Sequence, residues 1–121
     1  WPSALTYCEG LSLAGKSDWR LPNVKELQSI VDYARNDPAL DQRFLKQSDK
    51  KGWFWSSTTH GDNISMASYV CFGKCTSKSG IDTHGAGAQR SDPKTGNPKN
   101  WTSLGGQEDE VRINNLVRCV R

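Results

Sequence analysis

Apolar residues recur every three positions at the start of the chain, at Leu5, Cys8 and Leu11. This spacing predicts a short helix that places Cys8 on its buried face. Gly10 and Gly15 follow closely, and glycine is common where a helix ends. We therefore expect the first helix to stop at one of these two glycines.

A second and clearer helical pattern follows in the segment DWRLPNVKELQSIVDYA. Asn23 can accept a hydrogen bond from the helix N-terminus, and Glu26, three residues later, can complete a capping box. The apolar positions after the cap lie on one helical face: Val24, Leu27, Ile30, Val31 and Ala34. The sequence therefore predicts an amphipathic helix that begins after Asn23 and continues to Ala34.

The centre of the chain changes from loop to strand. Residues 36–52 are polar and charged, which predicts a loop with at most one short turn of helix. Trp53 and Trp55 then alternate with their neighbours, as residues on a β-strand do. The segment ISMASYVCFGKCTSKSG predicts a β-hairpin whose tight turn is formed by Gly73 and Lys74.

The last third of the chain contains a long polar insertion, residues 84–101. Its 18 residues include no Val, Ile, Leu or Phe, so burial of apolar side chains contributes little to its order. Gly85 and Gly87 permit backbone angles closed to most residues, and Asp92 precedes a proline and lies close enough to pair with Arg90. We therefore expect an ordered irregular loop here, followed by a final strand over the last five residues.

The resulting order is helix, helix, long loop, strands, irregular insertion and final strand. It predicts an α+β fold in which two helices pack on one side of a small antiparallel sheet with long irregular loops. With 121 residues the chain is large enough for one hydrophobic core, so residues 1–121 are expected to form a single domain. The chain starts at Trp1 without an initiator Met or a signal peptide, which suggests a fragment of a longer protein.

Composition limits the functions that the domain can have. Sixteen basic and thirteen acidic residues give a net charge of +3, which is too small to indicate a nucleic-acid partner. The longest apolar runs are only a few residues, so no membrane-spanning segment is expected. Four of the five tryptophans are expected in the core, and Trp101, whose neighbours are polar, is also a candidate for ligand contact.

Four cysteines, Cys8, Cys71, Cys75 and Cys119, permit three disulfide pairings. A bridge across the expected hairpin would join Cys71 to Cys75, which leaves Cys8 to pair with Cys119 and connect the two ends of the domain. A zinc site is one alternative, although this cysteine spacing is poor for zinc, and free thiols are another. Disulfides would place the domain in an oxidising compartment, so we expect it to be secreted or at the cell surface.

Four motifs occur together and in order: SDWRLPNVKELQSIVDY, FWSSTT, DTHGAGAQRSDPKTGNP and the terminal VRCVR. With these motifs the chain resembles the family named for the C-terminal domain of the Legionella collagen-like protein. The resemblance implies a C-type-lectin-like fold on an exported bacterial protein. It also implies an adhesin that binds sulfated glycosaminoglycans and forms a homotrimer, as the founding member does, with ligand carried by the long loops before the last strand.

The chain departs from calcium-dependent lectins of that fold. The Glu-Pro-Asn or Gln-Pro-Asp motif and the later Trp-Asn-Asp motif are both missing, which argues against a calcium-bridged sugar site. The nearest acidic group is Glu108, Asp109 and Glu110, which could bind a hard cation through oxygen or form a solvated turn. We assign no metal and no cofactor to the chain.

Candidates for catalysis are few. Ser56, Ser57 and His60 lie in one short stretch, but side chains so close in sequence rarely form a triad, and no nucleophile elbow is present. His84, flanked by glycine, could act as a base or bind a metal. The sulfatase-activating enzymes, which have a related fold, use a much longer chain and reactive cysteines. We therefore expect no enzymatic activity.

Basic residues in the loops are the best candidates for ligand binding. Sulfate and carboxylate groups pair with such cations, although any single lysine can equally be a solubilising charge. The candidate ligand-binding residues are Arg90, Lys94, Lys99, Lys74, Lys78 and Trp101. Three other arginines, which lie beside core residues, are interpreted as structural: Arg20, Arg118 and Arg121. The sequence thus indicates a non-enzymatic module that binds an anionic glycan; a protein-interaction or oligomerisation module at the end of a surface protein is the alternative.

Overall fold

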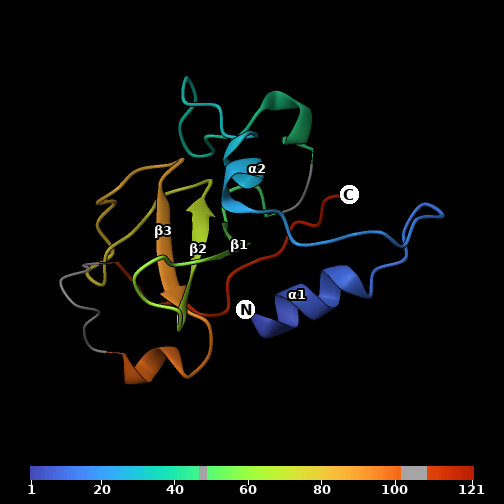
Figure 1. Ribbon diagram of the computed structural model, residues 1–121. Helices are drawn as coiled ribbons and strands as arrows, with labels where there is room; N and C mark the ends of the chain where they lie inside the picture. The colour runs from blue at the N-terminus through green and yellow to red at the C-terminus, as the bar shows by residue number, and fades with distance from the viewer. Residues whose placement is uncertain (47–48, 102–108) are drawn as a thin grey trace.

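Three strands form one antiparallel sheet in the order β1-β2-β3 (Figure 1). The computed structural model describes residues 1–46, 49–101 and 109–121. Within them the elements are α1 (Pro2–Glu9), α2 (Val24–Gln28), η1 (Gln42–Phe44), β1 (Trp53–Thr59), β2 (Met66–Cys71), β3 (Gln89–Pro93) and η2 (Pro98–Asn100). The predicted α+β class with two helices and a small antiparallel sheet is confirmed.

Alternate side chains of β1 and β2 belong to two hydrophobic clusters, one on each face of the sheet. Trp53 stacks on Tyr69 with ring centroids 4.9 Å apart, and both belong to a cluster that includes Ala4 and Cys8 of α1. Phe54, between the two strand tryptophans, packs in the other cluster together with residues of α2, β2 and the following loops: Leu27, Leu40, Val70 and Phe72. Because successive strand residues point to opposite faces, the two helices cover opposite faces of the sheet. The expectation that both helices lie on one side was wrong.

Helix α1 agrees with the sequence pattern. Pro2 occupies its first turn, where a missing N–H costs nothing, and Gly10 forms its C-cap. Cys8 is fully buried on the face predicted for it and forms a disulfide with Cys119. The second predicted disulfide, Cys71–Cys75, is also present.

Helix α2 begins as predicted but is much shorter. Asn23 Oδ1 accepts a hydrogen bond from Glu26 N at 2.9 Å, and Glu26 Oε2 accepts one from Asn23 N at 3.0 Å, which completes the capping box. The helix ends at Gln28, where the Ser29 hydroxyl donates to the Glu26 carbonyl and residues 29 and 30 form a turn. Val31 there pairs with Leu40 in an isolated bridge, so the predicted continuation to Ala34 was wrong.

The same capping glutamate makes the stability of the domain sensitive to acid. Arg20 donates to both carboxylate oxygens of Glu26 at 2.7 Å, and this contact together with the Asn23 N–H lowers the pKa of Glu26 to about 2. Because the folded pKa of Glu26 is lower than its unfolded pKa, near 4.3, the ionised carboxylate stabilises the fold at any pH above about 4.3. This stabilisation is lost as the pH falls toward about 2. In Glu26→Gln we expect the difference in melting temperature from the wild type to shrink between pH 5 and pH 2, measured by circular dichroism. A difference that is constant over this range would contradict the assignment.

The strand pairings around β2 differ from the predicted hairpin. Gly73 and Lys74 do not connect two strands; β2 instead pairs with β1 across residues 60–65 and with β3 on its other side. The segment after Cys75 closes on itself through an isolated bridge between Thr76 and Asp82. The predicted strand at Trp53 and Trp55 and the short helical turn in residues 36–52 are both confirmed.

The polar insertion contains the third strand of the sheet. Strand β3 pairs along its whole length with β2, so the expectation of an entirely irregular loop was wrong. Gly87, with φ of 91°, precedes β3 and packs so closely on Val31 that a Cβ would lie 2.9 Å from that side chain. The predicted final strand is not formed: residues 116 and 120 make only isolated bridges, to Phe54 and Arg20.

Each of the three arginines interpreted as structural contacts a carboxylate or an aromatic ring of the fold. Arg20 pairs with Glu26, and Arg121 Nε lies 2.8 Å from Asp18 Oδ1. The guanidinium of Arg118 lies 4.3 Å from the centre of the Phe54 ring, over the second hydrophobic cluster. The contacts of Arg118 and Arg121 fasten the C-terminal segment to the rest of the fold.

Candidate ligand-binding site

The candidate cations lie at two ends of the sheet. Lys94 N donates to Ser65 O at 2.9 Å, which places Lys94 beside the start of β2, and Lys99 lies nearby on η2. Lys74 follows the other end of β2, and Lys78 lies beyond it on the same loop. Because a six-residue strand is about 20 Å long, the two pairs of lysines do not form one continuous patch.

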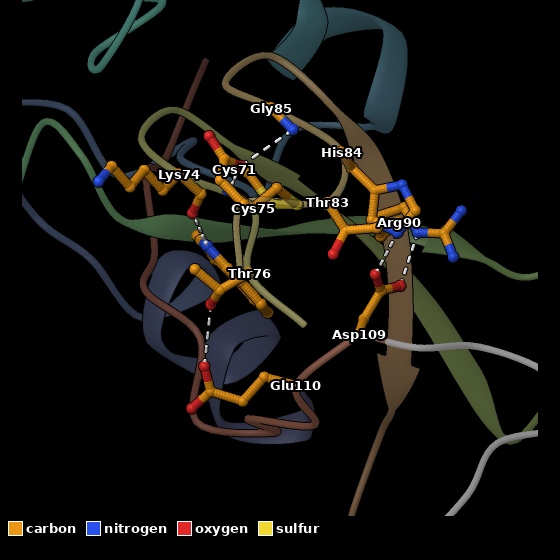
Figure 2. Close-up of a disulfide and its surroundings, with 12 residues drawn as sticks. Cys71, Lys74, Cys75, Thr76, Thr83, His84, Gly85, Arg90, Asp109 and Glu110 are labelled. Atoms are coloured by element: carbon orange, nitrogen blue, oxygen red, sulfur yellow. Dashed lines mark hydrogen bonds and ion pairs between the residues drawn. A yellow bond between two sulfur atoms is a disulfide. The ribbon is translucent and has the colours of Figure 1, made fainter. Parts of the chain in front are cut away.

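Arg90 is bound to a buried carboxylate rather than directed entirely to solvent. Its Nε donates to Asp109 Oδ2 at 2.6 Å, and His84 Nε2 lies 2.5 Å from the other oxygen of the same carboxylate (Figure 2). Asp109 is only 2% exposed, so its charge requires these partners. The predicted pair between Arg90 and Asp92 does not form, because Asp92 binds other groups.

The acidic group proposed as a cation site is divided by its contacts. Glu108 lies outside the described residues. Asp109 faces His84 and Arg90, whereas Glu110 Oε2 accepts from Thr76 Oγ1 at 3.2 Å and pairs with a nearby arginine. Within residues 1–46, 49–101 and 109–121, no group of His, Cys, Asp or Glu is arranged to hold a metal ion.

A groove of about 480 Å³ carries one of the candidate cations, Lys94. It lies between the first turn of α1, the loop after β3 and the C-terminal segment. Its lining residues are Trp1, Pro2, Ser3, Ala4, Trp55, Lys94, Thr95, Gly96, Ile113, Asn114, Asn115 and Val117. Three segments far apart in the sequence thus form one site.

Lys94 is held in a fixed position in this groove. Its Nζ donates to Thr59 Oγ1 at 2.7 Å and lies 4.3 Å from the centre of the Trp1 ring. The indole Nε1 of Trp1 in turn donates to Ser56 O at 2.8 Å, which fixes the ring. A cation over an aromatic face loses little rotational freedom when a ligand binds, so it is suited to pair with an anionic group.

The opposite wall of the groove is fastened by a buried carboxylate. Asp92 is fully buried, and its Oδ2 accepts hydrogen bonds from Arg112 N at 3.2 Å, Ile113 N at 3.1 Å and Asn115 Nδ2 at 2.9 Å. Burial raises the pKa of Asp92, and these three donors oppose that rise. Asp92 therefore fixes the segment that presents the exposed Asn114 side chain.

Ile113 in that wall adopts a backbone conformation that β-branched residues avoid. Its φ is 59°, in the left-handed region, where such residues are strained. The strain is held by the buried Asp92 carboxylate on one side and by Trp55 Nε1, which donates to Ile113 O at 3.0 Å, on the other. The surrounding core therefore determines the shape of this wall.

The chemistry of the groove suits an anionic ligand with hydroxyl groups. The groove offers one ammonium, one aromatic face and the polar side chains of Thr95, Asn114 and Asn115, and none of its lining residues is acidic. Amide side chains can both donate to and accept from hydroxyls, while the ammonium pairs with a sulfate or carboxylate. Among the candidate residues, Lys94 lines the groove, and Trp101 lies beside it against Gly96.

Sequence patterns did not identify most of the groove. Trp1 was expected only in the core, and Asn114 and Asn115 were not singled out. Neither residue type signals a site until the fold brings residues 1–4 and 113–117 together. Lys94 was identifiable because cations in a long polar loop are frequent ligand contacts.

Three comparisons with known proteins bear on this site. A protein-family model described as the Lcl C-terminal domain matches residues 1–90. No curated protein and no solved structure matches the chain. The matched range includes the first wall of the groove and ends within β3, before Lys94 and the C-terminal wall. In the described part of the chain, no helix has the length and apolar character needed to cross a membrane.

Proposed function

The chain belongs to the family of Lcl C-terminal domains, and from that membership we propose that it is a C-type-lectin-like module that binds anionic, sulfated glycans without catalysing a reaction. Two helices on a small antiparallel sheet, long irregular connections and a disulfide that joins the two ends of the domain are compatible with a lectin-like fold. Both disulfides suit an oxidising compartment, so the module is proposed to be secreted or on the cell surface.

One observation carries this proposal above the others. Lys94 is held between Thr59 and the Trp1 ring in a groove without acidic lining residues. A sulfate or carboxylate of a sugar can pair with the ammonium while the sugar ring contacts the indole and its hydroxyls meet the asparagines. Trp101, which lies against Gly96 at the edge of the groove, extends the same surface, and Lys99 is exposed on η2 two residues before it.

Retention on immobilised heparin tests the proposal. We expect the domain to be retained at physiological ionic strength and to elute as salt rises, because ions screen the contact. Lys94→Gln keeps the length of the side chain and removes its charge, and we expect about a tenfold loss of affinity, the usual scale for a hydrogen bond to a charged group. The matched control is Lys25→Gln, an exposed lysine on α2 away from the groove.

The outcomes separate the competing interpretations. Thermal unfolding of Lys94→Gln must first show a folded protein, because Lys94 also bonds Thr59. Equal losses in the two lysine variants would overturn the groove as the site, and the same comparison with Lys74→Gln and Lys78→Gln would assign the other end of the sheet. Absence of retention at physiological salt would overturn glycan binding and favour the protein-interaction or oligomerisation module.

A further inference from the structure

A second, smaller hollow lies on the sheet itself. Its volume is about 140 Å³, and its lining residues are His60, Ser68, Gln89, Arg90 and Ser91. It shares no lining residue with the groove beside Trp1. We call this hollow the strand niche.

The register of the sheet explains why these side chains meet. Ser68 of β2 lies directly opposite Ser91 of β3, and Gln89 is two residues along the same strand. Residues at such spacing point to the same face of a sheet. His60 follows the last residue of β1, its N donates to Met66 O, and the residue lines the same hollow. Strands β2 and β3 and the loop after β1 therefore contribute to the strand niche.

The hydrogen bond of His60 decides which of its nitrogens can contact a ligand. Asp62 N donates to His60 Nδ1 at 3.2 Å, so Nδ1 is occupied as an acceptor and Nε2 is the nitrogen left to donate to a ligand. The imidazole thus presents an N–H donor. Gln89 is exposed and adds an amide NH₂ group, and the serine hydroxyl of Ser68 adds a further donor.

No carboxylate is among the residues that line the strand niche, and the carboxylate bound to its Arg90 is already paired. Asp109, which would otherwise repel an anion, is buried and paired with Arg90 and His84. The volume of the niche equals that of about five water molecules, enough for one tetrahedral oxyanion. We propose that the strand niche binds a single oxyanion group, a sulfate or phosphate, either free or attached to a larger ligand.

This proposal goes beyond the glycan groove and does not depend on it. An oxyanion offers only acceptors, so it matches a niche whose side chains offer several donors. Binding at the niche would stand even if Lys94 contributes nothing to heparin retention, because the two sites share no lining residue.

Titration of the purified domain with sodium sulfate, followed by nuclear magnetic resonance at constant ionic strength, tests the niche directly. We expect saturable shifts at the Gln89 side-chain amide and the His60 ring, and about fivefold weaker binding in Gln89→Ala, the scale of one lost hydrogen bond. Gln89 is exposed, so this variant is expected to fold. Gln42→Ala changes an exposed glutamine on η1 that lines neither hollow, so it is the matched control and should bind sulfate like the wild type.

A second pair of titrations identifies the source of the oxyanion. A sulfated heparin disaccharide that shifts the same resonances and competes with inorganic sulfate would support a glycan sulfate as the occupant, and its desulfated form should not compete. Competition by inorganic phosphate and sulfate but not by the disaccharide would support a free anion. Shifts that rise linearly without saturation, or equal binding by Gln89→Ala and the wild type, would overturn the proposal.

Discussion

Replacing Asp92 with alanine is expected to destabilise the domain by about 3 kcal/mol or more, because the change leaves buried donors without an acceptor. The carboxylate accepts from two backbone N–H groups and one side-chain amide in a fully buried position. Without it, Ile113 also loses one of the contacts that hold its left-handed backbone. Urea unfolding followed by circular dichroism measures the loss.

Two further variants define this test. Asp62→Ala removes an exposed aspartate and should change stability by no more than about 0.5 kcal/mol. Asp92→Asn retains one acceptor oxygen and should lose clearly less than the alanine variant. A loss below about 1 kcal/mol in Asp92→Ala would show that the segment around Ile113 does not depend on this carboxylate.

The pH dependence of Asp92 has the opposite sign to that of Glu26. Burial raises the pKa of Asp92 above its unfolded value, which is near 3.9. An acid with a raised folded pKa contributes stability at low pH, and this contribution is lost as pH rises through the folded pKa. The free energy of unfolding of Asp92→Asn relative to that of the wild type should therefore increase as the pH rises from the unfolded pKa of Asp92 through its folded pKa.

Removing the Cys8–Cys119 disulfide is the second change with a large expected effect. The bridge closes a loop with a sequence separation of 111 residues, and the chain-entropy model gives a stabilisation of about 4–5 kcal/mol for such a loop. We expect the double variant Cys8→Ala and Cys119→Ala to lose stability on this scale, measured by urea unfolding.

The second disulfide supplies a matched control. Cys71 and Cys75 are separated by only 4 positions, so the same model gives about 2 kcal/mol for their bridge. The double alanine variant of this pair should therefore be the more stable of the two. Equal losses would show that packing of the sulfur atoms, rather than the entropy of the unfolded chain, determines the effect.

Local signals predicted the fold well where the interactions themselves are local. The capping box of Asn23 and Glu26 lies within four residues, so its pattern was sufficient. The end of α2 was not predictable in this way, because Val31 leaves the helix to pair with Leu40. Competition between a helical stripe and a tertiary contact is not visible in the spacing of apolar residues.

Strand β3 was missed for a related reason. Its residues show no alternation of apolar and polar types, which is the usual signal of a strand. Arg90 and Asp92 can lie on the inner face because they bind Asp109 and the 112–115 segment, about twenty positions further along the chain. Polar side chains that are satisfied by distant partners make a buried strand look like a loop in the sequence.

The candidate site was predictable in chemistry but not in place. The charges of Lys94 and Lys99 indicated an anionic ligand, and the resemblance to the Lcl family agreed with it. The groove, however, requires Trp1 and Asn114, which are 113 positions apart and meet only in the folded chain. No pattern along the sequence can identify a groove whose two walls come from opposite ends of the domain.

The disulfide between Cys8 and Cys119 also determines how the domain carries mechanical load. Trp1 to Ala4 precede Cys8 closely, and residues 113–117 precede Cys119, so both bridged segments line the groove. Tension applied between the two cysteines passes through a covalent bond, and the sheet between them bears none of it. A pull on a ligand that contacts residues 1–4 or 113–117 thus reaches the disulfide over a short path, whereas the part of the pull that Lys94 carries passes into β3.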